Sequence, residues 1–266
     1  MRINNLWNPF GKEYAWSRRW TALERCYILV FGLVDLPSRL RARLVVRTVR
    51  KCESKTLLDF GCGTGTYSFY FSRLPAVQVK GIDFNESRIA DCKFIAQKIG
   101  RNNVRFYSDA GHNGLQRFDN ESFDSVLAIE VFQYLPDLEL TMLEIHRVLT
   151  SGGYLFGHIP ALGYLRDTEH NIFDDKGFQN LLIETGFEIV LLTSTFGTPI
   201  RQLCKGFGRM INRKLMTAFL YPLLLILSSP FKVESRDGTY RLFVARKPAR
   251  INERERRSLN DRPIGP

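Results

Sequence analysis

The sequence has few cysteines, and they follow no recognisable pattern. The five are Cys26, Cys52, Cys62, Cys92 and Cys204. Their number is odd, and they form neither a CxxC pair nor a nearby CxxxH spacing, which argues against a disulfide framework and a zinc site. The first twenty residues also lack the apolar run followed by small residues that a secretory signal requires. We therefore expect a protein of the reducing cytoplasm that holds no metal.

Acidic residues are scarce in two flanking parts of the chain. Residues 1–52 hold eleven Lys and Arg against three Asp and Glu, and residues 196–214 hold five basic residues and no acidic one. The stretch 53–195 between them is acidic, with twelve basic and nineteen acidic residues, although the whole chain has a formal net charge of +11. The positive charge is therefore expected on the flanks of an acidic core.

The uncharged stretch 215–231 is too short to span a bilayer. A spanning helix needs about 20 apolar residues, and Pro222 interrupts this one. Because cations precede and follow it within 205–232, we expect a helix on an anionic membrane surface or a hydrophobic lid over an acceptor pocket. A helix buried against the sheet or against a dimer partner is the alternative. The expected localisation is cytoplasmic, with membrane association through this segment.

Short apolar runs alternate with helix-like stretches along most of the chain. The runs that predict strands are 56–60, 77–83, 103–108, 123–130, 153–159, 187–193 and 239–245. Helices are predicted over 65–74, 86–99 and 137–149, the last with apolar positions at Leu140, Leu143, Ile145 and Leu149. Strand alternating with helix predicts a doubly wound α/β fold, with a mostly parallel seven-stranded sheet covered on both faces.

Three stretches do not fit this alternation and suggest the domain organisation. Residues 1–52 are expected to form a basic helical extension, with Leu40 and Leu44 at helical spacing among several arginines. The central domain is expected over 53–246 and includes a hydrophobic and basic insertion over 196–235. The polar, arginine-rich stretch 247–266 predicts a disordered tail.

The motif Leu57-Leu58-Asp59-Phe60-Gly61-Cys62-Gly63-Thr64-Gly65 is an apolar strand running into a glycine-rich turn. Such a turn lets the backbone approach a ligand closely, because glycine has no β-carbon and tolerates positive φ. Asp83 follows at the end of the next strand, where a carboxylate can accept hydrogen bonds from ribose hydroxyls. The dinucleotide pattern GxGxxG requires glycine at position 66, where this chain has Thr66, so a turn facing S-adenosylmethionine is favoured over a pyrophosphate site.

The sequence DFGCGTG followed by GIDF resembles the first two motifs of the class I S-adenosylmethionine-dependent methyltransferases. The resemblance continues in order over 55–160, and 123–137 is similar to the family's fourth-strand motif. It implies S-adenosyl-L-methionine as cofactor. The cofactor-binding residues that it implies are Asp59, Gly61, Gly63, Gly65, Asp83, Phe84, Asp109, Ala110 and Glu130.

Several of these roles have plain alternatives. Phe84 is assigned to the adenine face, with a core phenylalanine as the alternative, and Asp109 to the adenine amino group, with an ordinary turn as the alternative. Glu130 ends the fourth strand, where a doubly wound sheet opens its ligand crevice. Its expected role is cofactor positioning or an acceptor contact, and a helix cap is the alternative.

Methyl transfer from a sulfonium is a direct displacement that depends on alignment, so no catalytic residue is obligatory. A hydroxyl acceptor would benefit from a base, for which His158 is the best-placed imidazole, ahead of His112 and His170. A structural, hydrogen-bonded histidine is the alternative. The family's fourth motif often has a histidine where this chain has Gln133-Tyr134, so no base is carried over from that position.

The function expected is methyl transfer to an amphipathic or lipid-like small molecule, because LPSRLRARLVV before the first strand looks like the lead-in of methyltransferases acting on quinones and lipids. A nucleic-acid methyltransferase is the first alternative, but the Asn/Asp-Pro-Pro-aromatic motif is absent, so nucleic acid is not the expected partner. A cofactor-binding assembly factor without catalysis is the second, and a nicotinamide-dependent oxidoreductase is the weakest. The sequence fixes neither the acceptor atom nor the oligomeric state.

Overall fold

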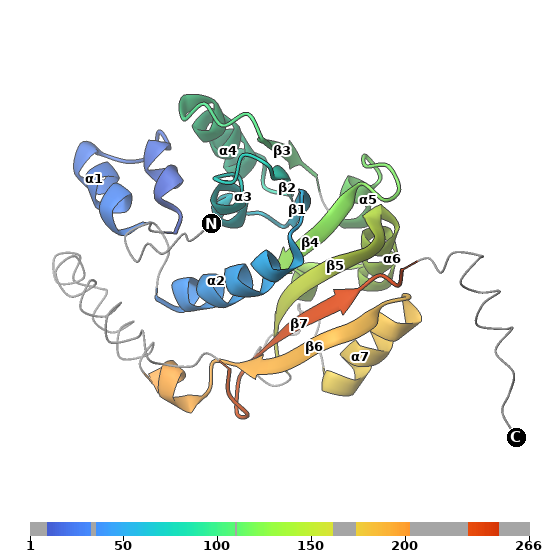
Figure 1. The fold of residues 1–266 in the computed structure, drawn as a ribbon. Coiled ribbons are helices and arrows are strands. Elements are labelled where there is room, and N and C mark those ends of the chain that lie inside the picture. The colour runs from blue at the N-terminus through green and yellow to red at the C-terminus, as the bar shows by residue number, and fades with distance from the viewer. Residues whose placement is uncertain (1–9, 33–35, 110, 162–173, 203–233, 250–266) are drawn as a thin grey trace, which may run out of the picture.

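The computed structural model describes residues 10–32, 36–109, 111–161, 174–202 and 234–249 (Figure 1). Several predictions fall outside these ranges: Ala110, His170, the whole segment 205–232 and most of the tail 247–266. None of the helices within the described ranges is both long and apolar enough to cross a membrane.

A seven-stranded sheet forms the centre of the molecule, as predicted. Its strands are β1 Thr56–Phe60, β2 Gln78–Asp83, β3 Val104–Ser108, β4 Phe123–Ile129, β5 Leu149–Pro160, β6 Glu188–Thr195 and β7 Tyr240–Arg246. They lie in the order β3-β2-β1-β4-β5-β7-β6. Only β7 runs against its neighbours, pairing antiparallel with both β5 and β6. The predicted fold class is therefore confirmed.

Helices cover both faces of the sheet, because successive side chains of each strand point to opposite sides. Leu57 packs in the core cluster shared with α2 Leu36–Val49, α3 Thr66–Phe71 and α4 Glu86–Lys98. Leu58, one residue later, packs in the cluster shared with α5 Gly111–Leu115, α6 Leu138–Val148 and α7 Asp175–Glu184. Two hydrophobic cores thus lie on the two faces of one sheet.

The prediction for the region around α6 needs two corrections. Leu140 and Leu143 are exposed, and the buried face of α6 is formed by Thr141, Met142, Ile145 and Val148. Strand β5 also begins at Leu149, so Ser151 to Gly153 lie inside the strand and not in a turn before it. Gly152 permits this with φ +80° next to the register shift between β4 and β5.

The N-terminal extension is helical and packs on the domain. It contains η1 Lys12–Trp16, α1 Ala22–Phe31, α2 and η2 Arg50–Cys52. Leu40 and Leu44 of α2 are buried in the first core, as their spacing predicts. Glu13 of η1 forms a buried ion pair with Arg73, with 2.7 Å between Oε1 and Nε. The extension therefore shares the core of the domain that follows it.

Candidate functional site

The glycine-rich turn follows β1 in the chain and is hydrogen-bonded to the end of β2. The N–H groups of Gly61 and Cys62 both donate to the Ile82 carbonyl, at 2.8 and 2.9 Å. Gly61, Gly63 and Gly65 have φ values of +73°, +54° and +72°, a region that side chains disfavour. The turn is consequently fixed by backbone geometry that requires glycine.

The three glycines face different surroundings. A β-carbon on Gly61 would lie 2.2 Å from Val131 Cγ2, and one on Gly65 would lie 2.9 Å from Phe69 Cε2. At Gly63 the nearest atom would be Arg88 Nη1 at 4.0 Å. Protein packing therefore accounts for glycine at 61 and 65, whereas the space beside Gly63 is open to a ligand.

Asp83 lies directly against this turn. Its Oδ2 accepts from Gly63 N–H at 2.8 Å and its Oδ1 accepts from Asn85 N–H at 3.0 Å. The residue is 6% exposed. Each carboxylate oxygen can accept more than one hydrogen bond, so the two backbone bonds orient the group and leave capacity for hydroxyl donors. Phe84, the next residue, is 70% exposed, which rules out the core alternative.

Asp59 is buried beneath the turn. Its Oδ2 accepts from the Ser68 N–H at 2.9 Å and the Ser68 O–H at 2.6 Å. Burial raises the pKa of this carboxyl to about 6, against the effect of the two hydrogen bonds. In this structure Asp59 therefore attaches the first turn of α3 to β1, and its predicted role toward a cofactor would be positional.

Asp109 follows β3 and lies beside the same site. Its N–H donates to the Asp83 carbonyl at 3.0 Å, and its carboxylate lies 3.3 Å from Arg117 Nη2. The structure thus brings Asp83, Phe84 and Asp109 to one edge of the sheet, where the parallel strands end.

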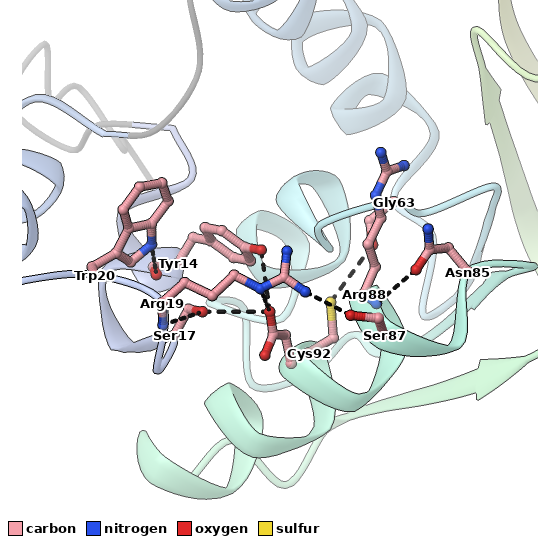
Figure 2. Close-up of polar contacts among 10 residues, drawn as sticks. Tyr14, Ser17, Arg19, Trp20, Gly63, Asn85, Ser87, Arg88 and Cys92 are labelled. Atoms are coloured by element: carbon pink, nitrogen blue, oxygen red, sulfur yellow. Dashed lines mark hydrogen bonds and ion pairs between the residues drawn. The ribbon is translucent and has the colours of Figure 1, made fainter.

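The N-terminal extension docks next to this edge (Figure 2). Arg19 Nε lies 2.8 Å from an Asp91 carboxylate oxygen on α4, and the hydroxyls of Tyr14 and Ser17 donate to the same oxygen at 3.4 Å. Cys92, the residue after Asp91 on α4, donates through its Sγ to the Gly63 carbonyl at 3.7 Å. Residues 14–19 therefore contact the helix that also contacts the glycine turn.

A second polar cluster lies at the ends of β4, β5 and β6. Glu130 directly follows β4 with φ +60°, and its N–H donates to the His158 carbonyl at 2.9 Å. Its Oε1 lies 2.5 Å from His158 Nδ1 and 3.5 Å from Arg41 Nη1. The positive φ of a glutamate is strained, and here it aims the carboxylate at two nitrogen donors. None of these contacts caps a helix, which was the alternative role for Glu130.

His158 lies completely inside this cluster. Its Nε2 is 2.9 Å from Thr195 Oγ1, and its ring stacks on Tyr240 with centroids 5.0 Å apart. Burial lowers the pKa of the imidazole, although Glu130 opposes this effect. A neutral ring next to a carboxylate carries its proton on Nδ1, so Nε2 accepts from Thr195. Both nitrogens are engaged and the ring is buried, so the geometry favours the structural alternative over a base that contacts an acceptor.

Sequence reasoning missed Arg41, Thr195 and Tyr240. Arg41 belongs to a helix whose many arginines look like a solvated face, but its guanidinium bonds Tyr67 as well as Glu130. No sequence signal could have paired it with Glu130, because the two are far apart in the chain. His112, the secondary candidate base, instead lies 3.8 Å from Asp137 Oδ2.

A protein-family profile described as a methyltransferase domain matches residues 51–174. This range contains the glycine turn, Asp83, Asp109, Glu130 and His158 in the arrangement described above. The chain therefore contains a class I S-adenosylmethionine-dependent methyltransferase domain. The N-terminal helix that carries Arg41 lies outside the matched range.

Curated relatives are similar to about half of this chain. The phthiotriol/phenolphthiotriol dimycocerosates methyltransferase of Mycobacterium tuberculosis is 34% identical over 123 residues, 45% of this chain and 44% of that protein. A sterol 24-C-methyltransferase of Gibberella zeae is 34% identical over 146 residues, 54% of this chain and 37% of that protein. The chain thus aligns with less than half the length of these relatives.

Solved structures share the fold of the methyltransferase domain at low identity. The [4+2]-cyclase SpnF superimposes with a TM-score of 0.60 and 21% identity, covering 78% of this chain and 80% of that one. The geranyl diphosphate C-methyltransferase of Streptomyces coelicolor A3(2) gives a TM-score of 0.59 and 16% identity, covering 90% and 89%. Since the first of these proteins is named a cyclase, the fold alone does not specify the reaction.

Proposed function

We propose that this protein transfers the methyl group of S-adenosyl-L-methionine to a lipid-like small molecule. The observation that carries the proposal is the contact between Gly63 and Asp83. It holds a carboxylate with spare acceptor capacity beside an open glycine backbone, at the edge of the sheet where the parallel strands end.

Each residue of the cofactor half has a part in this proposal. Asp83 receives the ribose hydroxyls, and the open backbone at Gly63 lies along the methionine portion. The exposed ring of Phe84 covers one face of the adenine, and Asp109 lies at its amino edge. Bound there, the cofactor supplies an electrophilic methyl group on a sulfonium.

The lipid-like acceptor is supported by the names of the relatives. They act on phthiotriol and phenolphthiotriol dimycocerosates and on sterols, and one structural neighbour holds geranyl diphosphate. These acceptors share a large apolar body. We propose an acceptor of this chemical class for this chain, and we do not propose any one of these molecules.

We assign the acceptor contact to Glu130. Its side chain is 23% exposed, whereas the His158 side chain beside it is 0% exposed, so only the carboxylate reaches the crevice. For a hydroxyl acceptor, the oxygen forms a bond to the methyl carbon while the sulfur keeps the electron pair of the broken bond, and the hydroxyl proton passes to Glu130. Arg41 and His158 hold the carboxylate in place and do not touch the acceptor.

Association with an anionic membrane through 205–232 and location in the cytoplasm complete the proposal. The membrane part is supported by the sequence of that segment, which is uncharged over 215–231 and flanked by cations, and the cytoplasmic part by the unpaired pattern of the cysteines. Equal recovery of the wild type and of a Leu223→Ser, Leu224→Ser, Leu225→Ser variant with anionic liposomes would remove this part of the proposal.

Two measurements test the function itself. Calorimetric titration with S-adenosylhomocysteine measures cofactor binding, and incubation with methyl-labelled S-adenosylmethionine and a total lipid extract measures transfer. We expect saturable binding and label in the organic phase. Asp83→Asn keeps the size of the side chain but loses the charge, and it is expected to weaken binding at least about tenfold, or ~1.4 kcal/mol.

Asp119→Asn is the matched control, because Asp119 is an exposed aspartate on another part of the same domain. Label confined to the aqueous phase would overturn the lipid-like acceptor while keeping the cofactor site. Binding that is absent from the wild type, or unchanged in Asp83→Asn, would overturn the proposed function.

A further inference from the structure

Helix α1 turns an apolar face toward solvent. Its exposed residues are Ala22, Leu23, Cys26, Leu29 and Val30, and Leu23 and Val30 are 82% and 56% exposed. At 100° per residue these five positions span about 120° of the helix circumference. No charged residue lies within that arc.

This arrangement is the reverse of an ordinary surface helix, whose outer face is polar. The two charged residues of α1 lie outside that arc: Glu24 closes a capping box with Thr21, and Arg25 Nε donates to the Ala15 carbonyl at 3.1 Å. Helix α4 nearby follows the ordinary rule, since Glu86, Arg88, Lys93 and Lys98 are all exposed. The apolar face of α1 therefore needs an explanation of its own.

Helix α1 lies at the side of the molecule where the proposed site opens. It packs on η1, and the segment between them is held on α4 by Arg19 and Asp91 (Figure 2). Figure 1 shows α1 and the beginning of α2 on the side toward which the arrowhead of β6 points. The carboxyl ends of the parallel strands lie on that side as well.

The charge around α1 favours a negatively charged partner. Residues 10–32 contain four Lys and Arg against two Asp and Glu, and residues 36–51 add six Lys and Arg and no acid. Arg18 and Arg19, immediately before the helix, are both exposed. An apolar helix face bordered by cations is the pattern of a helix that lies in the interface of an anionic bilayer, with its apolar side chains at the boundary between headgroups and acyl chains.

We propose that α1 is an interfacial membrane anchor, with Leu23, Leu29 and Val30 inserted into an anionic lipid surface. The helix has ten residues and is about 15 Å long, too small by itself for the roughly 1,200 Å² that a stable protein interface buries. A bilayer imposes no such minimum area. The choice of lipid also rests on the proposed function, because a lipid-like acceptor would be reached from the bilayer.

The test is sedimentation with vesicles of equimolar phosphatidylcholine and phosphatidylglycerol, compared with vesicles of phosphatidylcholine alone. A Leu23→Ser, Val30→Ser variant is expected to lose at least about tenfold in partitioning to the anionic vesicles. The matched control is Ile183→Ser, Val190→Ser, which removes side chains that are 61% and 56% exposed on α7 and β6. This control should bind vesicles like the wild type.

Titration with S-adenosylhomocysteine shows that each variant is folded and separates the two proposals. If the wild type neither binds cofactor nor transfers methyl, but binds vesicles in a way that the α1 variant loses, the proposed function would be overturned and the anchor supported. Equal vesicle binding by the wild type and the α1 variant would overturn the anchor. The anchor would also be overturned if the α1 substitutions changed only the self-association of the protein, measured by sedimentation without lipid. The apolar face would then be a contact between two copies.

Discussion

The two polar clusters at the carboxyl ends of the strands, the proposed cofactor half and the proposed acceptor half of the site, are constructed differently. The cofactor half comes from neighbouring strand ends between Asp59 and Asp109, and its key contact is a backbone N–H of Gly63 on the Asp83 carboxylate. The acceptor half joins Arg41, Glu130, His158 and Thr195, which come from an N-terminal helix and three strand ends. Its contacts run from side chain to side chain.

This difference predicts different consequences of mutation. Backbone contacts in a positive-φ turn depend on the absence of a side chain, so a single methyl group can remove them. Side-chain contacts depend on the chemical groups at the ends, so isosteric changes can alter the chemistry and leave the fold intact. The following variants test the two halves against each other.

Gly61→Ala should have the largest effect. The new β-carbon would lie 2.2 Å from Val131 Cγ2, at a residue with φ +73°. Backbone strain of about 1–2 kcal/mol and overpacking of about 1–3 kcal/mol together predict a loss of roughly 2–5 kcal/mol in the free energy of unfolding. Urea unfolding measures it.

Gly63→Ala is the matched comparison, because it places a methyl group at positive φ in open space. It should cost only the strain, about 1–2 kcal/mol, and yet weaken binding of S-adenosylhomocysteine. Adding Val131→Ala to Gly61→Ala should restore part of the stability. Equal unfolding energies for the two glycine variants would show that packing around the turn does not distinguish them.

Asp59→Asn should change how stability depends on pH. The folded protein raises the pKa of Asp59 from 3.8 to about 6, so it favours the protonated form. The stabilisation is present below pH 3.8 and is lost as the pH rises through about 6, a change of about 3 kcal/mol at 1.36 kcal/mol per pKa unit. The variant stays neutral, so the unfolding free energy of wild type minus variant should fall between pH 4 and pH 7. A constant difference would contradict the assignment.

Glu130→Gln should separate the acceptor half from the cofactor half. We expect transfer to slow about 100-fold, the lower end for loss of a general base, while the affinity for S-adenosylhomocysteine stays within about twofold. The exposed Glu139→Gln is the control. Parallel losses of transfer and of affinity would assign Glu130 to the cofactor, as its first predicted role had it.

His158→Gln should have the smallest effect of these variants, and the effect is on how stability depends on pH. Burial lowers the pKa of His158 below 6.5, so folding favours the neutral ring. The contribution is present above pH 6.5 and is lost as the pH falls through the folded pKa, because the unfolded chain then binds the extra proton. The variant should therefore lose less stability than the wild type between pH 7 and pH 5. Urea midpoints at the two pH values measure this, and identical losses would show that the ring titrates alike in both states.

The predictable part of the site follows from local rules. Strand β1 and its turn could be predicted because a short apolar run, three glycines and the spacing to Asp83 are all local features. The inward face of α6 was predicted wrongly, since Leu140 and Leu143 look like core residues and yet are exposed. Hydrophobicity alone does not say which arc of a helix meets the sheet.

The sequence by itself determined the seven strands, the fold class and the glycine turn, because periodicity and glycine φ preferences act within a few residues. Only the tertiary structure decided that Arg41 reaches Glu130, that His158 is enclosed by Thr195 and Tyr240, and that α1 exposes its apolar face. These outcomes depend on which segments of the chain come into contact when the protein folds. Partners separated by many tens of residues leave no periodic signal in the chain.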